Sequence, residues 1–348
     1  MLFDTVRRRC IHGAMISAVT VAVAVVSACT SSPTVVERPG ADHDGGIEVI
    51  AQERLDERTV DLTVRSKALA QDTAVRLLTP TGWHDRTPER TWPVLYLLPG
   101  GDGDHTSWTT DTDIAGVAQL RDALIVIPGM PMFGFYSDWD ADGPRVESFH
   151  LDEMIPLLER DFGASRKRAI AGISQGGYGA LKYAALRPGV FGAAASYSGW
   201  LHPLRQPEVV LGAAAFLGVD GFALWGDPVR DRTRWAANDP YLLADKLVGI
   251  PLYLSSGDGT IGEFDPPNLL REPLFPEIDR LAADFPAGTV DLTEAVMGES
   301  TRLVADRLQA SNATVTTHLT PGTHSPPYWH DNFHRSLPIL LEALGIRR

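Results

Sequence analysis

The chain has 348 residues, of which 44% are hydrophobic and 22% charged, so it can bury the core of one large α/β domain or two small domains. This composition excludes a disordered or fibrous protein, and the formal net charge of −13 argues against nucleic-acid binding, which depends on clustered Lys and Arg. The only cysteines are Cys10 and Cys29. Because both lie in the N-terminal segment, the rest of the chain offers no thiol for a disulfide, for catalysis or for a metal site.

The N-terminal segment has the pattern of an export signal. Three arginines near the start precede an apolar run at 14–26 that is too short to span a bilayer comfortably. The sequence Val-Ser-Ala-Cys at 26–29 resembles the bacterial lipoprotein box, in which the cysteine is acylated. We therefore expect a lipoprotein signal peptide at 1–28 and a lipid on Cys29 that anchors the protein to the outer side of the cell membrane. An ordinary signal peptide cut after Ala28 is the alternative.

The segment 29–47 is rich in Ser, Thr, Pro, Gly and charged residues, which predicts a flexible tether to a catalytic domain at 48–348. The pattern becomes extended from Glu48. Apolar and polar residues alternate at 60–64, and 74–78 is a second β-prone run after a polar gap. These two segments predict a pair of antiparallel strands at the edge of a sheet.

Short apolar runs then recur, and most of them are separated by stretches long enough for a helix. This pattern is typical of a mainly parallel sheet with helices on both faces. The runs lie at 94–98, 123–127, 168–173, 190–197, 251–255 and 314–319. Such sheets bind ligands at the carboxyl ends of their strands, so the loops that leave these runs are the candidates for a site.

Residues 172–176 read Gly-Ile-Ser-Gln-Gly, which is the G-x-S-x-G pattern of a nucleophile elbow. The pattern follows the β-prone run at 168–173 and opens a helix-like segment at 177–186, as an elbow requires. Glycines let the strand and the helix pass close together, and the strained turn lifts the serine hydroxyl above the sheet. We predict Ser174 as the nucleophile and the N–H group of Gln175 as one oxyanion donor.

A serine nucleophile needs a base, and in α/β-hydrolases an acid and then a histidine follow the serine along the chain. His318 lies within the last predicted strand, while His330 and His334 have the spacing of a helix surface. His324 follows the last strand in a Pro-Gly-Thr-His turn that can direct its imidazole toward Ser174. We therefore predict His324 as the base.

Three carboxylates are candidates for the acid that orients this histidine. Asp258 comes just after the strand at 251–255, although Asp is also common in turns of this Gly-Asp-Gly type. Glu294 and Glu299 lie in a helix-like segment at 291–308, where the alternative role is a solvated helix face. Spacing alone does not choose among the three.

A glycine-rich loop, Pro-Gly-Gly-Asp-Gly at 99–103, directly follows the predicted strand at 94–98. Pro99 has no N–H group, so Gly101 is the best candidate for the second oxyanion donor. A phosphate-binding loop is the alternative. The segment lacks the Gly-Lys-Ser/Thr ending of that motif, which argues against phosphate.

From about 94 to 344 the chain resembles the antigen 85 mycolyltransferases and the wider putative-esterase family, which includes esterase D and feruloyl esterases. The resemblance rests on the elbow and on dispersed motifs in the same order. These motifs are Phe-Tyr-Ser-Asp-Trp at 135–139, Leu-Trp-Gly at 224–226, Asn-Asp-Pro at 238–240, Gly-Asp-Gly-Thr at 257–260, Gly-Thr-His-Ser at 322–325 and Tyr-Trp at 328–329. It implies an α/β-hydrolase fold, and we expect a helical cap insert at about 200–245.

The resemblance also bears on the acid. In that family the acid is a glutamate in the helix before the last strand, with a Ser/Thr and Thr/Asn pair six and seven residues later. Glu294 has Ser300 and Thr301 at those offsets, so the resemblance implies Glu294, with Asp258 as the runner-up. The family also places its second oxyanion donor at the position of Gly101.

The sequence departs from the mycolyltransferases around the substrate. They carry Asp-Gly-Leu-Arg across the glycine-rich loop, where polar side chains help to hold trehalose, and this chain has Pro-Gly-Gly-Asp at 99–102. For Phe135, Tyr136 and Trp139 we weigh two roles, which are lining an acyl or aromatic pocket and packing in the core under a loop.

Together these features predict an exported, lipid-anchored serine hydrolase that cleaves carboxylic esters through an acyl-enzyme on Ser174, without a metal or cofactor. The expected substrate is an acyl ester, such as a cell-envelope lipid or an acylated sugar. The altered loop favours water over a sugar hydroxyl as the acceptor, which leaves an acyltransferase as the alternative. A non-catalytic surface binding protein is a third interpretation, but an idle site has no reason to keep a strained elbow.

Overall fold

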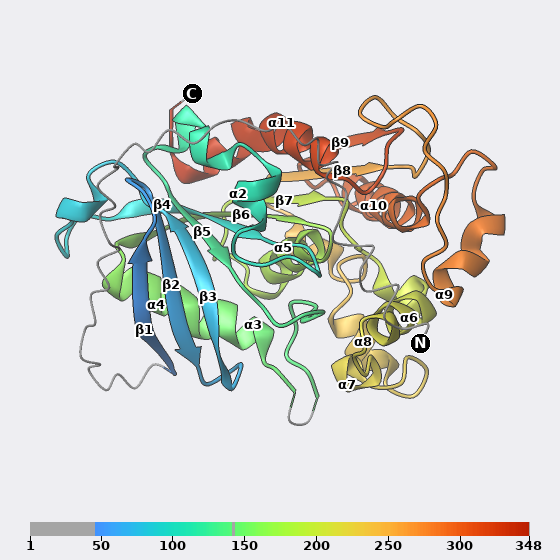
Figure 1. The fold of residues 1–348 in the computed structure, drawn as a ribbon, viewed down its shortest axis with the longest axis horizontal. Helices are drawn as coiled ribbons and strands as arrows, with labels where there is room; N and C mark the ends of the chain where they lie inside the picture. The colour runs from blue at the N-terminus through green and yellow to red at the C-terminus, as the bar shows by residue number, and fades with distance from the viewer. Residues whose placement is uncertain (1–45, 141–142, 348) are drawn as a thin grey trace, which may run out of the picture. The chain divides into compact units, whose positions relative to one another are not determined.

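A computed structural model describes residues 46–140 and 143–347. Within them, one sheet of nine strands runs through the domain (Figure 1). The strands are β1 (Ile47–Arg54), β2 (Thr59–Ser66), β3 (Gln71–Leu78), β4 (Trp92–Leu98), β5 (Leu124–Pro128), β6 (Ala164–Ile173), β7 (Ala194–Tyr197), β8 (Leu252–Gly257) and β9 (Val315–Thr320). The α-helices are α2 (Ser107–Asp111), α3 (Val146–Ser148), α4 (Ile155–Asp161), α5 (Gln175–Leu186), α6 (Pro207–Phe216), α7 (Phe222–Trp225), α8 (Arg232–Ala237), α9 (Pro276–Asp279), α10 (Leu292–Ala310) and α11 (Pro326–Leu344).

The strands are arranged in the order β1-β2-β3-β5-β4-β6-β7-β8-β9. Strands β1, β2 and β3 form an antiparallel edge, and β3 pairs with β5. The six strands β5, β4, β6, β7, β8 and β9 are parallel to one another. The carboxyl ends of the parallel strands therefore meet at one edge of the sheet. In register, Gly172 of β6 lies opposite Leu98 of β4, and Ile173 lies opposite Tyr197 of β7. The elbow thus leaves the sheet between the ends of β4 and β7.

The structure confirms the mainly parallel sheet, with two local differences from the sequence prediction. The antiparallel edge has three strands instead of two, because β1 pairs with β2. As the outermost strand, β1 has partly exposed side chains on both faces, so its sequence does not alternate clearly. Strand β7 is shorter than the predicted run at 190–197, because Val190 completes a turn in which its N–H group donates to Arg187 O.

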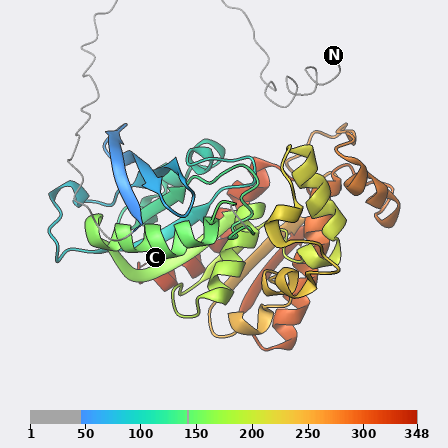
Figure 2. The ribbon, with the colours of Figure 1, turned by 90° about the horizontal axis from the view of Figure 1, so that it is seen from below.

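Helices cover both faces of the sheet (Figures 1 and 2). Along β4, Val94 and Tyr96 join the core under α4, α5 and α10, while Leu95 and Leu97 join the core under α2 and α11. Burial of one such side chain stabilises the fold by about 1.5–3 kcal/mol. A strand that is buried on both faces needs a continuous apolar run, which is why these strands stand out in the sequence.

The segment between β7 and β8, where the sequence predicts an insert at about 200–245, is mostly helical. It contains α6, α7 and α8, drawn in yellow in Figure 1. Within the part of the chain that the structure describes, no helix is long and apolar enough to cross a membrane. The expected signal peptide at 1–28, Cys29 and all but the end of the tether lie outside the described residues.

Candidate active site

Ser174 lies on a sharp turn between β6 and α5. Its φ of 56° and ψ of −122° form a conformation that residues other than glycine rarely adopt. Two backbone hydrogen bonds hold the turn: Ser174 N–H donates to Tyr197 O at 2.9 Å, and Tyr178 N–H donates to Ser174 O at 3.1 Å. A strained serine between a strand and a helix is the geometry of a nucleophile elbow.

Close packing explains the two outer glycines of the elbow. A Cβ atom on Gly172 would overlap the carbonyl group of Gly176, and a Cβ atom on Gly176 would overlap the carbonyl group of Leu98. Both obstacles are backbone atoms, which cannot move without shifting β4 or α5. The G-x-S-x-G pattern therefore reflects how closely α5 crosses the ends of β4 and β6.

Glu294 and His324 are in direct contact. Glu294 lies in the first turn of α10, and His324 lies between β9 and α11, just after Gly322, whose φ is 154°. His324 Nδ1 and Glu294 Oε2 are 2.6 Å apart, and the backbone N–H of His324 donates to Asp291 Oδ2 at 2.8 Å. The pair fixes the orientation of the imidazole and leaves Nε2 as the nitrogen available for proton transfer.

The carboxylate of Glu294 is buried, with 1% of the residue exposed, and is well supplied with hydrogen-bond donors. Its Oε1 accepts from Ser198 Oγ at 2.8 Å, from Ser256 Oγ at 2.7 Å and from Gly257 N–H at 2.5 Å. An unpaired buried charge would be costly, so these donors are what allow a carboxylate here. Its Oε2 remains directed at His324.

The surroundings of His324 change its basicity. Burial lowers the pKa of the imidazole, but the hydrogen bond and charge of Glu294, together with the charges of Asp291 and Asp102, outweigh burial and raise the pKa above its ordinary value of 6.5. The ring of Trp329 stands edge-on to the imidazole, with 5.1 Å between ring centroids. A raised pKa makes the imidazole a stronger base and stabilises the imidazolium that forms when it accepts a proton.

Ser174 lies at the same edge of the sheet as this pair. Tyr197 accepts from the Ser174 backbone, and the next residue, Ser198, donates to Glu294. Among the described residues, however, the Ser174 hydroxyl forms no hydrogen bond, so the structure does not show a direct Ser174–His324 contact. Such bonds are often long in free enzymes and tighten when the substrate binds. The catalytic roles of the three residues stay predictions.

The rival carboxylates have other partners. Asp258 is exposed, and its Oδ1 accepts from the N–H and the hydroxyl group of Thr260 at 2.9 Å and 2.6 Å. This is the geometry of a turn residue. Glu299 forms an ion pair with Arg205 at 2.7 Å. Neither carboxylate contacts the imidazole of His324.

The other late histidines also lie apart from the predicted acid. His318 Nδ1 is 2.9 Å from Asn332 Oδ1. His330 and His334 are half-exposed on α11 and face Asp113, in agreement with a position on a helix surface.

The glycine-rich loop at 99–103 packs against the elbow. A Cβ atom on Gly100 would touch Ser174 Cβ at 3.6 Å, and one on Gly101 would overlap the side-chain amide of Gln175. Within the described residues, the backbone N–H groups of Gly101 and Gln175 donate no hydrogen bond. Two unpaired N–H groups near Ser174 are the arrangement that an oxyanion hole needs, although this role also stays a prediction.

Of the two roles weighed for Phe135 and Tyr136, the structure supports packing in the core under a loop. Neither exposes any of its surface. The ring of Phe135 packs 4.8 Å from that of Tyr178 and edge-on to that of Trp225 at 5.3 Å, measured between centroids. Both residues have positive φ, a tight turn that the aromatic pattern does not signal. Trp139 is partly exposed.

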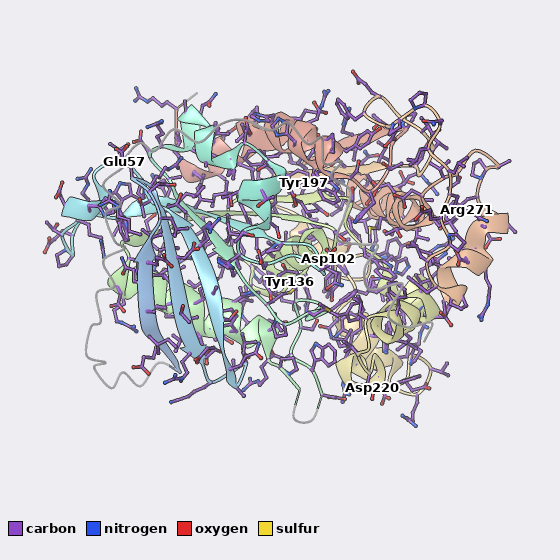
Figure 3. All side chains as sticks on the ribbon, viewed as in Figure 1. Glu57, Asp102, Tyr136, Tyr197, Asp220 and Arg271 are labelled. Carbon is purple, nitrogen blue, oxygen red and sulfur yellow. The ribbon has the colours of Figure 1, made fainter. Side chains whose placement is uncertain are left out.

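The loop at 135–139 also holds the glycine-rich loop in place. Tyr136 donates its hydroxyl to Pro99 O at 2.6 Å, so it anchors the start of the glycine-rich loop; Tyr136 and Asp102 of that loop are labelled in Figure 3. Asp138 accepts from the N–H and the hydroxyl of Ser148 at 2.9 Å and 2.6 Å. It therefore fixes the loop.

Three residues that contact the Glu294–His324 pair, Ser198, Ser256 and Asp291, were not predicted from the sequence. Asp291 is the N-cap of α10, and its Oδ1 accepts from Glu294 N–H at 3.0 Å. The Asp-x-x-Glu spacing at the start of the predicted helix could have indicated Asp291 as its N-cap. In a capping box the glutamate would turn back to the cap, whereas here its carboxylate faces His324. The two serines donate from β-strand ends that only the fold brings to the acid.

The model of the Esterase family, described as "Putative esterase", matches residues 66–340. Esterase Rv1288 of Mycobacterium tuberculosis is 32% identical over 225 residues, which cover 61% of this chain and 48% of that protein. The chain thus spans about half the length of this relative.

Two further similarities involve antigen 85-type proteins. The diacylglycerol acyltransferase/mycolyltransferase Ag85B of Mycobacterium leprae is 28% identical over 269 residues, covering 72% of this chain and 76% of that protein. The crystal structure of Mycobacterium tuberculosis MPT51 superposes with a TM-score of 0.62 at 22% identity, covering 81% of this chain and 96% of that chain. The structural likeness shows that the α/β-hydrolase fold is shared.

Proposed function

The chain belongs to the Esterase family, and on that premise we propose that it is a serine esterase that cleaves carboxylic esters through an acyl-enzyme on Ser174. The observation that carries the proposal is the 2.6 Å contact of Glu294 with His324 at the sheet edge where the strained Ser174 lies. The substrate is an acyl ester, such as a cell-envelope lipid or an acylated sugar.

In the first half-reaction, Ser174 Oγ attacks the ester carbonyl carbon while His324 Nε2 takes the hydroxyl proton. Glu294 holds the imidazole in the required tautomer and stabilises the imidazolium. The N–H groups of Gly101 and Gln175 bind the oxyanion. The intermediate then breaks its bond to the alcohol, which leaves with the proton from His324, and the acyl group stays on Ser174.

In the second half-reaction, a water molecule attacks the acyl-enzyme. His324 takes a proton from the water, the carbonyl carbon gains the hydroxyl, and the bond to Ser174 breaks as the proton returns to Oγ. The products are the carboxylic acid and the restored serine. Every step uses groups of the chain and water.

Labelling with a fluorophosphonate probe tests the nucleophile. The wild-type chain should bind one probe, and Ser174→Ala should bind none. Ser165→Ala is the matched control, because Ser165 lies in the same strand, β6, at its other end. Absence of labelling in the wild type, or equal labelling of Ser174→Ala, overturns the proposal and favours a non-catalytic binding protein.

An acyltransferase is the second candidate function, and the similarity to Ag85B favours it. The same acyl-enzyme would then pass its acyl group to a sugar hydroxyl in place of water. Hydrolysis of short and long acyl esters, measured with and without trehalose, separates the two. We expect release of free acid in both conditions; accumulation of an acylated sugar would establish transfer.

We also propose that the protein is exported and anchored to the membrane by a lipid on Cys29, with the tether at 29–47 and the catalytic domain at 48–348. The lipoprotein-like Val-Ser-Ala-Cys sequence supports this. Metabolic labelling with a radioactive fatty acid should mark the wild type but not Cys29→Ala. We further propose that the helices at about 200–245 form a cap over the site.

A further inference from the structure

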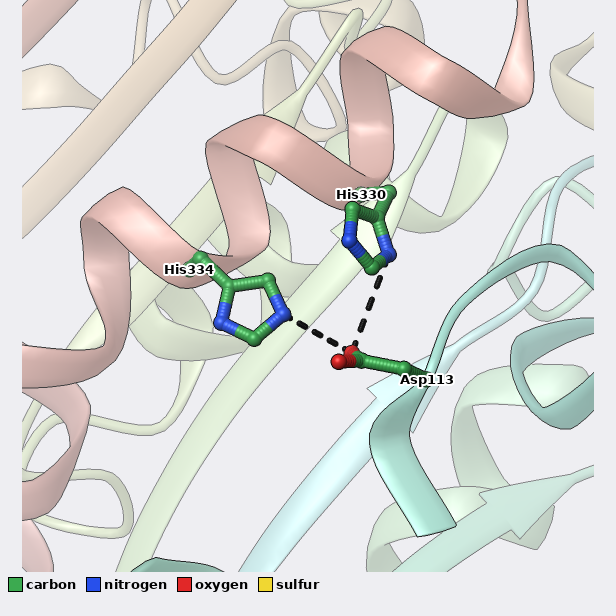
Figure 4. Close-up of side chains that lie close together, drawn as sticks. All are labelled: Asp113, His330 and His334. Carbon is green, nitrogen blue, oxygen red and sulfur yellow. Dashed lines mark hydrogen bonds and ion pairs between the residues drawn. The ribbon is translucent and has the colours of Figure 1, made fainter. Parts of the chain in front are cut away.

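Two histidines and one aspartate gather on the surface of the protein (Figure 4). His330 and His334 lie one turn apart on α11, and Asp113 lies at the start of a short 3₁₀ turn, Ile114–Gly116. His334 Nε2 is 2.8 Å from Asp113 Oδ1, and His330 Nδ1 is 3.7 Å from the same oxygen. One atom of each of the three side chains lies within 4.8 Å of the other two.

Packing beneath this cluster joins the two segments that carry it. Residues four apart on a helix share a face, so α11 presents both imidazoles together. On the neighbouring turn of α11, Phe333 is fully buried and packs edge-on against Trp108 of α2, with 5.7 Å between ring centroids. The segment that carries Asp113 is thus held beside α11 without help from the cluster, and its side chains need little reorganisation to bind a ligand.

A simple ion pair explains only one of the two imidazoles in this cluster. One carboxylate is balanced by one protonated imidazole, and a second protonated imidazole beside it would be repelled. Two neutral imidazoles, in contrast, each offer a nitrogen lone pair, and the carboxylate offers an oxygen. Two nitrogens and one oxygen form a ligand set that suits Zn²⁺ and similar transition metals, which bind such atoms at about 2.0–2.2 Å.

We propose that Asp113, His330 and His334 form a binding site for a divalent transition-metal ion such as Zn²⁺. The side chains are 52%, 42% and 38% exposed, respectively, so water can complete the coordination and the ion can exchange. The ion would link α11 to the segment that follows α2. Because α2 follows the glycine-rich loop and α11 follows His324, the metal would brace the two segments that flank the site, without entering the reaction.

Calorimetric titration of the full chain with Zn²⁺ tests this site. The protein must carry no histidine tag and must first be stripped with EDTA. We expect one Zn²⁺ per chain, with affinity lowered about tenfold or more in His330→Ala, His334→Ala and Asp113→Asn. His105→Ala is the matched control, because His105 also faces a carboxylate, Asp61 at 3.4 Å, but among the described residues it belongs to no group of three possible metal ligands.

Thermal unfolding gives a second readout. Zn²⁺ should raise the Tm of the wild type and of His105→Ala, and should not raise that of the three ligand variants. Mg²⁺ and Ca²⁺ should have no effect, because they prefer oxygen ligands. Because the three positions are exposed, the ligand variants should fold normally, and circular dichroism in EDTA checks this. No uptake of Zn²⁺, or equal uptake by His330→Ala and His334→Ala, would reduce the cluster to an ion pair and overturn the proposal.

Discussion

Glu294 Oε2 lies 2.6 Å from His324 Nδ1, although the two residues belong to α10 and to the turn before α11. The other carboxylate oxygen of Glu294 is held by Ser198, Ser256 and Gly257, so the carboxylate cannot rotate away from the imidazole without losing these donors. This one contact supports Glu294 as the acid and His324 as the base, and it leads to the first two predictions.

Replacing Glu294 by Gln should lower kcat for ester hydrolysis by on the order of a thousandfold, because the amide neither selects the imidazole tautomer nor stabilises the imidazolium. Asp258→Asn and Glu299→Gln are matched controls at the rival carboxylates and should change kcat by less than about twofold. Steady-state kinetics on one ester compares the three. A large loss in Asp258→Asn with a small one in Glu294→Gln would assign the acid to Asp258.

The raised pKa of His324 predicts the acid limb of the pH profile of kcat/KM. Catalysis needs the neutral imidazole, so the rate should fall as the pH drops through this pKa, which lies above 6.5. In Glu294→Gln the burial of the ring acts without the opposing carboxylate, so the limb should move to lower pH. A limb that stays in place in the variant would show that Glu294 is not the cause of the shift.

Gly176→Ala should destabilise the fold by about 2 kcal/mol or more and abolish probe labelling, because the added Cβ atom would overlap the carbonyl group of Leu98. Gly288→Ala is the control, since a Cβ atom there meets nothing within 4 Å, and it should change stability by less than about 0.5 kcal/mol. Chemical denaturation measures both. Equal stability of the two variants would contradict the packing explanation of the elbow.

Phe135→Ala should destabilise the protein by about 3–5 kcal/mol, because it empties a fully buried aromatic position. The preference among acyl chain lengths should not change. Met132→Ala, in the same loop but 60% exposed, should alter stability by less than about 0.5 kcal/mol. If Phe135→Ala instead keeps its stability and changes the preferred chain length, the residue has the pocket role after all.

Much of the sheet could be predicted because β4, β5, β7, β8 and the second half of β6 are buried on both faces and need continuous apolar runs. The edge strand β1 could not, because side chains on both of its faces are partly exposed and no alternation results. Aromatic residues were ambiguous for a related reason. A ring in a pocket and a ring in a core look alike in sequence, and only the packing of Phe135 against Tyr178 separates them.

By itself the sequence determined what depends on near neighbours along the chain: a serine between glycines at a strand end, and a histidine in a turn after the last strand. Only the tertiary structure decided which carboxylate contacts His324, since Asp258, Glu294 and Glu299 all had acceptable spacing. It likewise brought Asp113 beside His334, 221 residues away. Such contacts join elements through the packing of the whole sheet, and no local pattern encodes them.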